Sequence, residues 1–364
     1  MPASWFANPP RLRLSGPAAL VEAVPFLLGF RPCNSVVVIA LSVVADGSPR
    51  VMASARAGLE PSAVSALEGF ARRVAELGAD RVVLLAYGDQ YPSTEPGDLT
   101  WLDGAGADRL ACAGAVAATF GRYGLDVVDV LVVSHVEGEP GGDGWRWRSS
   151  WCVDLMCCPA EGRFVPTGGV VSAEAVGLGM TALPSRSGIE EELAVDASVA
   201  EQVESALVDQ PRTPFLDDDE RQLEIGAIQA ALDAEVGAQP IDPAVAARFL
   251  AALRDVHVRD AVAVALSRRG ARDQRQAALR AAQRFWLSLT RAAPSGWAAP
   301  PATLLAMTSY RLGDGARANA ALDRALADDP TYSLAQIVEQ ALVLAIPPQE
   351  LEAIWVRSSR LRSA

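Results

Sequence analysis

The sequence contains no lysine, so all 32 of its basic side chains are arginines. A Walker phosphate-binding loop needs a lysine on the phosphates, and Schiff-base or pyridoxal-phosphate chemistry needs a lysine amine, so the sequence excludes these classes of site. Histidine is scarce as well, with 2 residues in a chain of 364. Catalysis by histidine therefore has little material, and the sequence assigns neither a catalytic residue nor a cofactor.

Cysteine is sparse, and a long apolar run is missing. The five cysteines are odd in number and dispersed, unlike the cysteines of a secreted disulfide framework: Cys33, Cys112, Cys152, Cys157 and Cys158. The first residues, MPASWFANPPRLRL, lack the pattern of a signal peptide. No later segment reaches the roughly 18 uninterrupted apolar residues that a membrane-spanning helix needs. We expect a cytoplasmic protein that neither is exported nor spans a membrane.

Acidic residues outnumber basic ones by 44 to 32, which gives a formal net charge of -12. A broad nucleic-acid-binding surface is disfavoured, because binding to phosphates depends on clustered cations. A chain of 364 residues is long enough for two domains with separate cores.

The first half of the chain alternates between strand and helix patterns. The expected elements are strands at 35–44, 50–57, 81–87 and 126–135, helices at 18–24, 61–78 and 105–123, and an edge strand or hairpin return at 145–148. The run at 35–44 is apolar on both faces and predicts a central strand. The pattern predicts an α/β domain over residues 1–169, with a mixed, mostly parallel sheet that is covered by helices.

From Ser172 onward the strand signals vanish. Helical periodicity predicts helices at 190–208, 217–236, 243–266, 274–292 and 302–312. The charged segment 209–220 contains prolines and predicts a loop or hinge. We therefore expect an all-α domain over residues 170–364, with the domain boundary near Gly168 and Gly169.

Residues 310–330, within a unit of about 301–330, resemble a single tetratricopeptide repeat. The matching positions are Gly313, Ala318, Leu322, Ala325 and Pro330. One repeat cannot bury its own faces, so an ordinary helical hairpin that completes the core is favoured over a peptide-binding groove. A protein partner on the helical domain remains the alternative.

Three tryptophans and three cysteines gather between Trp145 and Pro159. The thiols of Cys152, Cys157 and Cys158 could bind zinc with His135 as a fourth ligand, but their spacing argues against a metal site, and we assign none. Cys152 could instead form a redox pair with Cys157 or Cys158 beside Arg146 or Arg148, and Cys33 or Cys152 could form a dyad with His135. Buried cysteines that act as small apolar side chains beside tryptophans are the favoured interpretation.

Arginines also mark the ends of the predicted strands. Arg31, Asn34 and Ser35 lie where a turn enters the strand at 35–44, and Arg56 ends the neighbouring strand. Together with Arg146 and Arg148 they could bind a small anionic molecule, since guanidinium groups match carboxylates and phosphates. Solvated or salt-bridged arginines are the alternative.

Several of these motifs together resemble a known family. They are Leu27 to Pro32 before the valine-rich strand, Trp151 to Pro159 with Gly162, Leu183 to Arg186, and the closing repeat-like unit. Over nearly its full length the chain resembles an actinobacterial family of uncharacterised proteins, domain of unknown function family 4192. The resemblance implies a bacterial cytoplasmic protein but no activity.

The family pattern draws attention to a set of positions: Arg31, Ser35, Arg56, Trp151, Cys152, Cys157, Cys158 and Arg186. Arg186 thereby joins the candidates for binding an anion. Cys33 and His135 lie outside the pattern, which weakens a mechanism built on either of them.

The leading hypothesis is a non-catalytic protein that binds a small anion or acts as an adaptor. An enzyme that uses Cys152, Cys157 and Cys158 for redox chemistry or zinc binding is one alternative, and a scaffold that acts through the helical domain is the other. The sequence leaves the identity of the ligand and the oligomeric state open.

Overall fold

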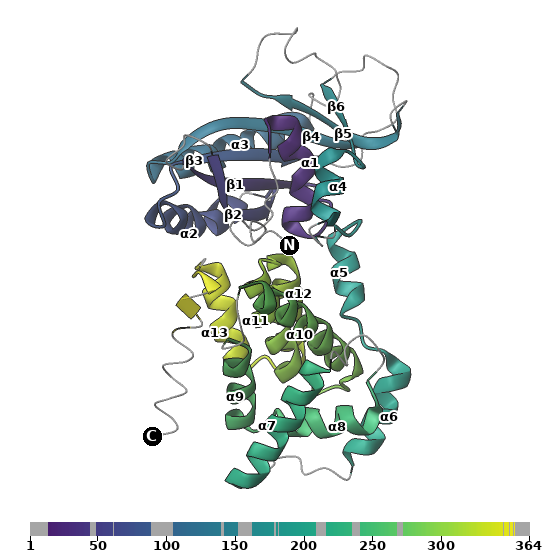
Figure 1. The fold of residues 1–364 in the computed structure, drawn as a ribbon. Coiled ribbons are helices and arrows are strands. Elements are labelled where there is room, and N and C mark those ends of the chain that lie inside the picture. The colour runs from purple at the N-terminus through teal and green to yellow at the C-terminus, as the bar shows by residue number, and fades with distance from the viewer. Residues whose placement is uncertain are drawn as a thin grey trace, which may run out of the picture. The chain divides into compact units, whose positions relative to one another are not determined.

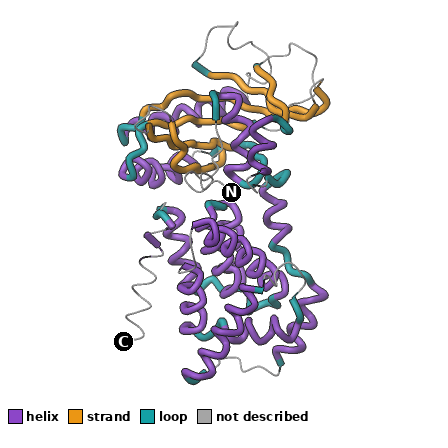
Figure 2. The backbone as a smooth tube through the Cα atoms, viewed as in Figure 1, coloured by secondary structure: helices purple, strands orange, loops and turns teal. Residues whose placement is uncertain are grey.

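The chain forms two compact units in a computed structural model, Met1–Arg186 and Ser187–Ala364 (Figure 1). The first contains a sheet with helices, and the described part of the second is helical (Figure 2). The structure describes residues 14–43, 49–60, 62–88, 105–139, 142–151, 162–177, 180, 182–208, 216–234, 241–267, 272–344, 346–348, 350, 351 and 353.

The sheet of the first unit has the strand order β2-β1-β3-β4-β5-β6. The strands are β1 (Ser35–Val43), β2 (Pro49–Gly58), β3 (Arg81–Tyr87), β4 (Asp126–Glu139), β5 (Gly142–Ser149) and β6 (Arg163–Pro166). The strands that the sequence predicts are thus confirmed, and β1 lies in the interior of the sheet as its apolar run indicates. The segment at 145–148 is a hairpin return within β5 and not an edge, because β6 pairs with its outer side.

The first unit also has four helices in its described part: α1 (Pro17–Leu28), α2 (Ser62–Glu76), α3 (Ala105–Arg122) and α4 (Val170–Gly177). Helices α2 and α3 pack on each other, α2 contacts β2, and α3 contacts β1, β3 and β4. Helix α1 contacts β5, β6 and α4. The architecture is α/β in the broad sense that the sequence predicts.

The prediction of a mostly parallel sheet is wrong. Among the described strands, β3 and β4 pair in parallel, and the other neighbours pair antiparallel. The β1–β2 hairpin explains the difference, because the connection through α2 carries the chain from β2 past β1 to β3. Strand β1 therefore separates two strands that run in the same direction, and the parallel βαβ unit is restricted to β3, α3 and β4.

The contact pattern divides the chain after Arg186, later than residues 169 and 170. Helix α4 belongs to the first unit, where it packs on α1. The backbone N–H of Ser172 on α4 donates a hydrogen bond of 2.7 Å to the buried carboxylate of Glu22 on α1. This bond satisfies one of the free N–H groups at the start of α4.

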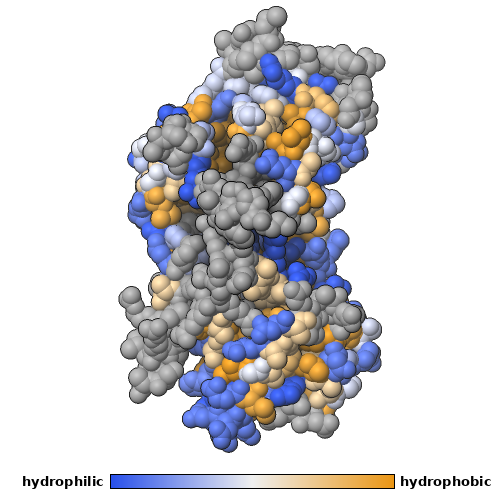
Figure 3. Space-filling view, viewed as in Figure 1, coloured by the Kyte–Doolittle hydropathy of each residue, from blue (hydrophilic) through white to orange (hydrophobic). Residues whose placement is uncertain are grey.

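The described part of the second unit is built from consecutive helices, the first of which begins at Arg186, the last residue of the first unit. They are α5 (Arg186–Glu192), α6 (Ala197–Leu207), α7 (Asp218–Asp233), α8 (Pro243–Ala252), α9 (Val256–Ser267), α10 (Arg272–Ala292), α11 (Ala299–Leu312), α12 (Gly315–Asp328) and α13 (Ser333–Val343). Within the part of the chain described here, no helix combines the length and apolar character needed to cross a membrane. Figure 3 shows hydrophilic residues gathered at the lower end of this unit, where α7 lies in Figure 1.

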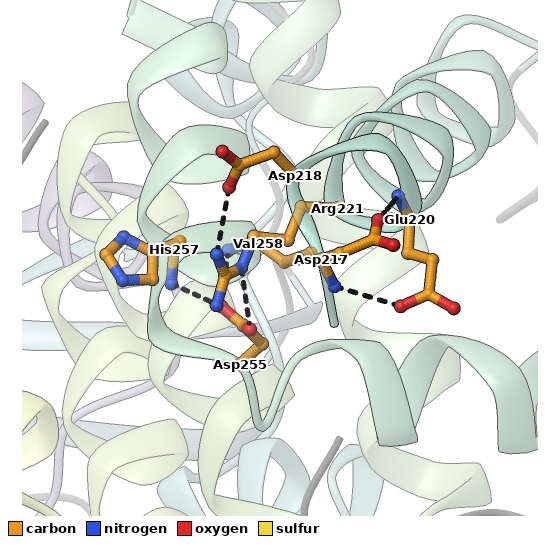
Figure 4. Close-up of polar contacts among 7 residues, drawn as sticks. All are labelled: Asp217, Asp218, Glu220, Arg221, Asp255, His257 and Val258. Atoms are coloured by element: carbon orange, nitrogen blue, oxygen red, sulfur yellow. Dashed lines mark hydrogen bonds and ion pairs between the residues drawn. The ribbon is translucent and has the colours of Figure 1, made fainter. Parts of the chain in front are cut away.

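Acidic caps set the starts of two helices in the second unit, one of which, near residue 217, periodicity also predicts. Asp217 and Glu220 form a capping box at the start of α7, with hydrogen bonds of 2.8 and 2.9 Å (Figure 4). The single helix expected at 243–266 is in fact α8 and α9, because Asp255 accepts hydrogen bonds from the backbone N–H groups of His257 and Val258 at 2.8 and 3.3 Å. A carboxylate in this position favours a new helix start over continuation of the old one.

Candidate functional site

The segment from Phe30 to Asn34 crosses from the end of α1 to the start of β1. Gly29 ends α1 in the left-handed conformation, with φ of 80°. The backbone N–H of Leu183 donates a hydrogen bond of 2.9 Å to the carbonyl of Gly29. The carbonyl of Leu183 accepts a hydrogen bond of 2.9 Å from the backbone N–H of Arg31. These two hydrogen bonds join the motif from Leu27 to Pro32 to the motif from Leu183 to Arg186.

Arg56 lies next to the end of β2 and contacts this segment in two ways. Its Nη2 donates a hydrogen bond of 3.2 Å to the backbone carbonyl of Cys33, and its guanidinium lies 5.6 Å from the centre of the Phe30 ring. Its Nε is buried and has no hydrogen-bond partner. The guanidinium is thus held in place, and one of its donors is buried without an acceptor.

A second positive charge lies close to Arg56. Burial lowers the pKa of Arg56, and the charge of Arg186 lowers it further, while the charges of Cys33 and Glu60 oppose the shift. A guanidinium group whose charge is disfavoured by burial and by a nearby positive charge is a common feature of a site where an anion binds.

Polar side chains from neighbouring strands share one face of the sheet with Arg56. In the pairing register Ser35 of β1 is opposite Tyr87 of β3, and Tyr87 is opposite Val133, which is opposite Trp147 of β5. Directly paired residues point to the same face. Ser35 and Tyr87 are 0 % exposed, and Ser35 Oγ, the Tyr87 hydroxyl and Trp147 Nε1 have no hydrogen-bond partner. Burial raises the pKa of Tyr87 well above its usual value, so the hydroxyl stays protonated.

His135 of β4 continues this face. The centre of its ring lies 4.9 Å from the ring centre of Trp145 in an edge-to-face contact. The ring centre of Tyr87 lies 5.5 Å from that of Trp145, also in an edge-to-face contact. His135 Nε2 is buried without a partner, and Nδ1 lies 3.9 Å from a carboxylate oxygen of Glu137. Burial lowers the pKa of His135, the positive charge of Arg31 lowers it further, and Glu137 and Asp143 oppose the shift.

These residues lie toward the carboxyl ends of β2, β3 and β4, which run in one direction. Ligands of open α/β sheets bind beyond the carboxyl ends of the strands. The location agrees with a binding site, and we define the anion site as Arg31, Arg56 and Arg186, and the polar row as Ser35, Tyr87, His135 and Trp147.

The structure separates the predicted site residues into two groups. Arg31, Ser35, Arg56 and Arg186 lie in the region just described, and Asn34 lies beside Ser35 with a φ of 40° and a backbone hydrogen bond of 3.5 Å to Gly88. The alternation of β5 places Arg146 and Arg148 on the opposite face from Trp145 and Trp147.

Tyr87, Trp145 and Trp147 are the residues of this region that sequence reasoning does not single out as binding candidates. Tyr87 ends a strand that is buried and apolar from Val82 onward, and a polar aromatic residue at the carboxyl end of such a strand is a signal that could have identified it.

The cysteine hypotheses depend on residues outside the described part of the chain. Cys152, Cys157 and Cys158 lie there, and within the residues that are described no group of three or more His, Cys, Asp and Glu side chains could hold a metal. Cys33 is exposed, and burial raises the pKa of the Cys112 thiol, with Glu60 contributing. His257 is exposed on α9, in agreement with the helix surface that its sequence context predicts.

The model of one protein family matches residues 17–349 of the chain. The chain belongs to this family, which is described as a domain of unknown function (DUF4192). No curated protein and no solved structure matches the chain. Membership of DUF4192 therefore supplies no activity, and function has to be argued from the site.

The helical unit of this DUF4192 chain has a pocket of its own, of about 410 Å³. Its lining includes Glu201 and Glu204 of α6 and Arg324 and Asp328 of α12. The carboxylate of Asp328 is already satisfied, because it accepts hydrogen bonds from the backbone N–H groups of Gly296, Ala298 and Ala299 at 2.8, 2.8 and 3.0 Å. Asp328 thus has a structural role in the wall of this pocket.

Proposed function

We propose that the first unit binds a small anion at the carboxyl ends of β2, β3 and β4, through the guanidinium groups of Arg31, Arg56 and Arg186. The observation that carries the proposal is the pair of like charges at Arg56 and Arg186, one of them partly buried with an unpartnered Nε. A carboxylate or phosphate would neutralise the charge of Arg56 and accept a hydrogen bond from its unpartnered Nε.

The placement of Arg56 supports this role over a purely structural one. Its contacts with Cys33 and Phe30 fix the side chain but do not neutralise its charge, since one is a carbonyl and the other a ring face. Glu60, whose charge opposes the lowered pKa, has a smaller effect than Arg186. The positive charge of Arg56 is thus held at this end of the sheet in a protein with a net charge of -12.

Calorimetric titration of the full chain with phosphate, sulfate and acetate at low ionic strength tests the proposal. We expect Arg56→Gln to weaken binding about tenfold or more, because a hydrogen bond to a charged group contributes about 1.5–3 kcal/mol. Arg186→Gln should weaken it less, because Arg186 is exposed. Arg122→Gln is the matched control: this exposed arginine of α3 pairs with Glu68 at 3.5 Å and should leave binding unchanged. Failure of every anion to bind, or an unchanged affinity in Arg56→Gln, would contradict the proposal.

We further propose that α11 and α12 form the tetratricopeptide-like unit of an adaptor surface in the second unit. In support, Gly313 ends α11 with a φ of 82°, and Ala318, Leu322 and Ala325 of α12 are buried. Helix α12 packs on both α11 and α13. A crystal structure in which these helices cross at angles unlike those of tetratricopeptide repeats would contradict this assignment.

The cellular setting that we propose is the cytoplasm of an actinobacterium. It is supported by the use of arginine for every basic side chain, by the odd number of dispersed cysteines and by the family resemblance. Localisation of a tagged full chain in an actinobacterial host tests the cytoplasmic location. Recovery of the protein outside the cytoplasm would contradict it.

A further inference from the structure

The polar row carries four buried side-chain atoms that have no hydrogen-bond partner: Ser35 Oγ, the Tyr87 hydroxyl, His135 Nε2 and Trp147 Nε1. They come from four different strands and share one face of the sheet. Buried polar atoms are almost always paired in folded proteins, so a group of four at one place requires an explanation.

The four residues form one continuous band with the anion site. Ser35 is paired with Tyr87, and Trp145 contacts the rings of both Tyr87 and His135. At one end of the band, Arg56 is the diagonal neighbour of Ser35, because Ser35 pairs with Gly58 two residues further along β2. The charge of Arg31, which also belongs to the anion site, acts on His135 of the polar row.

The chemistry of these atoms indicates the partner that they lack. Trp147 Nε1 can only donate a hydrogen bond, whereas the hydroxyls of Ser35 and Tyr87 can donate and accept. Hydroxyl groups also donate and accept, so a body with several hydroxyls suits the whole row. Trp145 is 2 % exposed and lies between Tyr87 and His135, so it offers no free ring face on which a base could stack.

We infer that the ligand of the first unit is an anion with a hydroxyl-bearing body, in the class of sugar phosphates and sugar acids. Its anionic group contacts Arg56 and Arg186, and its hydroxyl groups bind the polar row. The inference rests on the proposed function and adds to it the class of the ligand. Because the four atoms are closed to solvent, the side chains that cover them must move when the ligand enters.

Titration of the full chain with inorganic phosphate, ribose 5-phosphate, glucose 6-phosphate and gluconate tests the inference. We expect at least one of the hydroxylated anions to bind at least tenfold more tightly than phosphate. Tyr87→Phe should abolish this advantage and leave the affinity for phosphate unchanged. Tyr123→Phe is the matched control, because its hydroxyl donates to Glu68 at 3.1 Å on α2, outside the polar row.

A second measurement separates a ligand from an internal water as the missing partner. If the Tyr87 hydroxyl has no partner in the free protein, Tyr87→Phe raises the midpoint of thermal unfolding; if an internal water already satisfies it, the substitution lowers the midpoint and the inference is wrong. Equal affinities for phosphate and for all hydroxylated anions would also overturn the inference while leaving anion binding intact. Failure of all these anions to bind would overturn both.

Discussion

The protonation of His135, a residue of the polar row, is coupled to the charge of Arg31 in the candidate site. Burial and the charge of Arg31 lower its pKa, so the folded state favours the neutral imidazole. In the unfolded chain the pKa returns to about 6.5. The unfolded state therefore binds the proton more readily than the folded state. The contribution of neutral His135 to the free energy of unfolding is fully present above about pH 6.5, and it is lost as the pH falls toward the lower pKa of the folded state.

We expect the free energy of unfolding, measured in urea, to decrease between pH 6.5 and 5, and we expect His135→Gln to remove most of this decrease. The chain has 2 histidines, and His257→Gln is the matched control because His257 is exposed. Carboxylates titrate mainly below this window. A decrease that persists in His135→Gln and disappears in His257→Gln would show that the wrong histidine has been identified.

The anion-site residues were accessible to sequence reasoning, but the polar row was not. Arg31, Ser35 and Arg56 follow turn residues or end predicted strands, so their position at a strand end can be predicted. Tyr87 of β3 and Trp147 of β5 lie on one face of the sheet because both β3 and β5 are neighbours of β4. That order depends on long-range pairing, which local patterns do not encode.

Among the elements, strands and helices followed from local signals, whereas their pairing directions did not. Apolar runs and glycine turns identify β1, β3 and β4 correctly. Strand β1 lies antiparallel between β2 and β3 because the connection through α2 returns to the sheet beside β1. The hydrophobic pattern of β3 would equally fit a place beside β2. Helix boundaries are also hard to predict from periodicity. The helical periodicity continues through Asp255, but the side chain of Asp255 caps a new helix there.

The junction of α1 and α4 yields a prediction at the scale of elements. Glu22→Ala removes the acceptor for the Ser172 N–H and should lower the free energy of unfolding by about 1–3 kcal/mol, the cost of an unpaired buried group. Glu174→Ala, on the exposed surface of α4, should change it by less than about 0.5 kcal/mol. Urea denaturation of both variants checks the difference, and equal effects would contradict the role of Glu22.

Asp328 joins the end of α12 to the start of α11 in the same way. Its carboxylate accepts the backbone N–H groups of Gly296, Ala298 and Ala299, so Asp328→Ala leaves three donors without their partner. We expect a loss of about 2–4 kcal/mol in thermal or urea unfolding. Asp323→Ala, at an exposed position of the same helix, is the control and should have little effect.

On the scale of the whole molecule, each unit has the interior that independent folding requires. Val36 to Ala40 are fully buried in the first unit, and Leu250, Trp286 and Leu304 are at most 1 % exposed in the second. The division by contacts falls after Arg186. We therefore expect the fragments 1–186 and 187–364 each to unfold cooperatively, the second with the circular dichroism spectrum of a helical protein.

A cut after residue 169, the boundary indicated by composition, provides the contrasting test. It removes α4 from the first unit, and with it the N–H of Ser172 that satisfies the buried carboxylate of Glu22, and it also removes the backbone bridge between Arg31 and Leu183. A buried polar group without a partner is costly, so fragment 1–169 should aggregate or unfold at lower urea than 1–186. Equal stability of the two fragments, measured side by side, would show that α4 and the Leu183 bridge are not part of the first folding unit. If fragment 1–169 instead stays folded, anion binding by 1–186 that is lost in 1–169 would place the Leu183 to Arg186 segment in the binding site and not only in the fold.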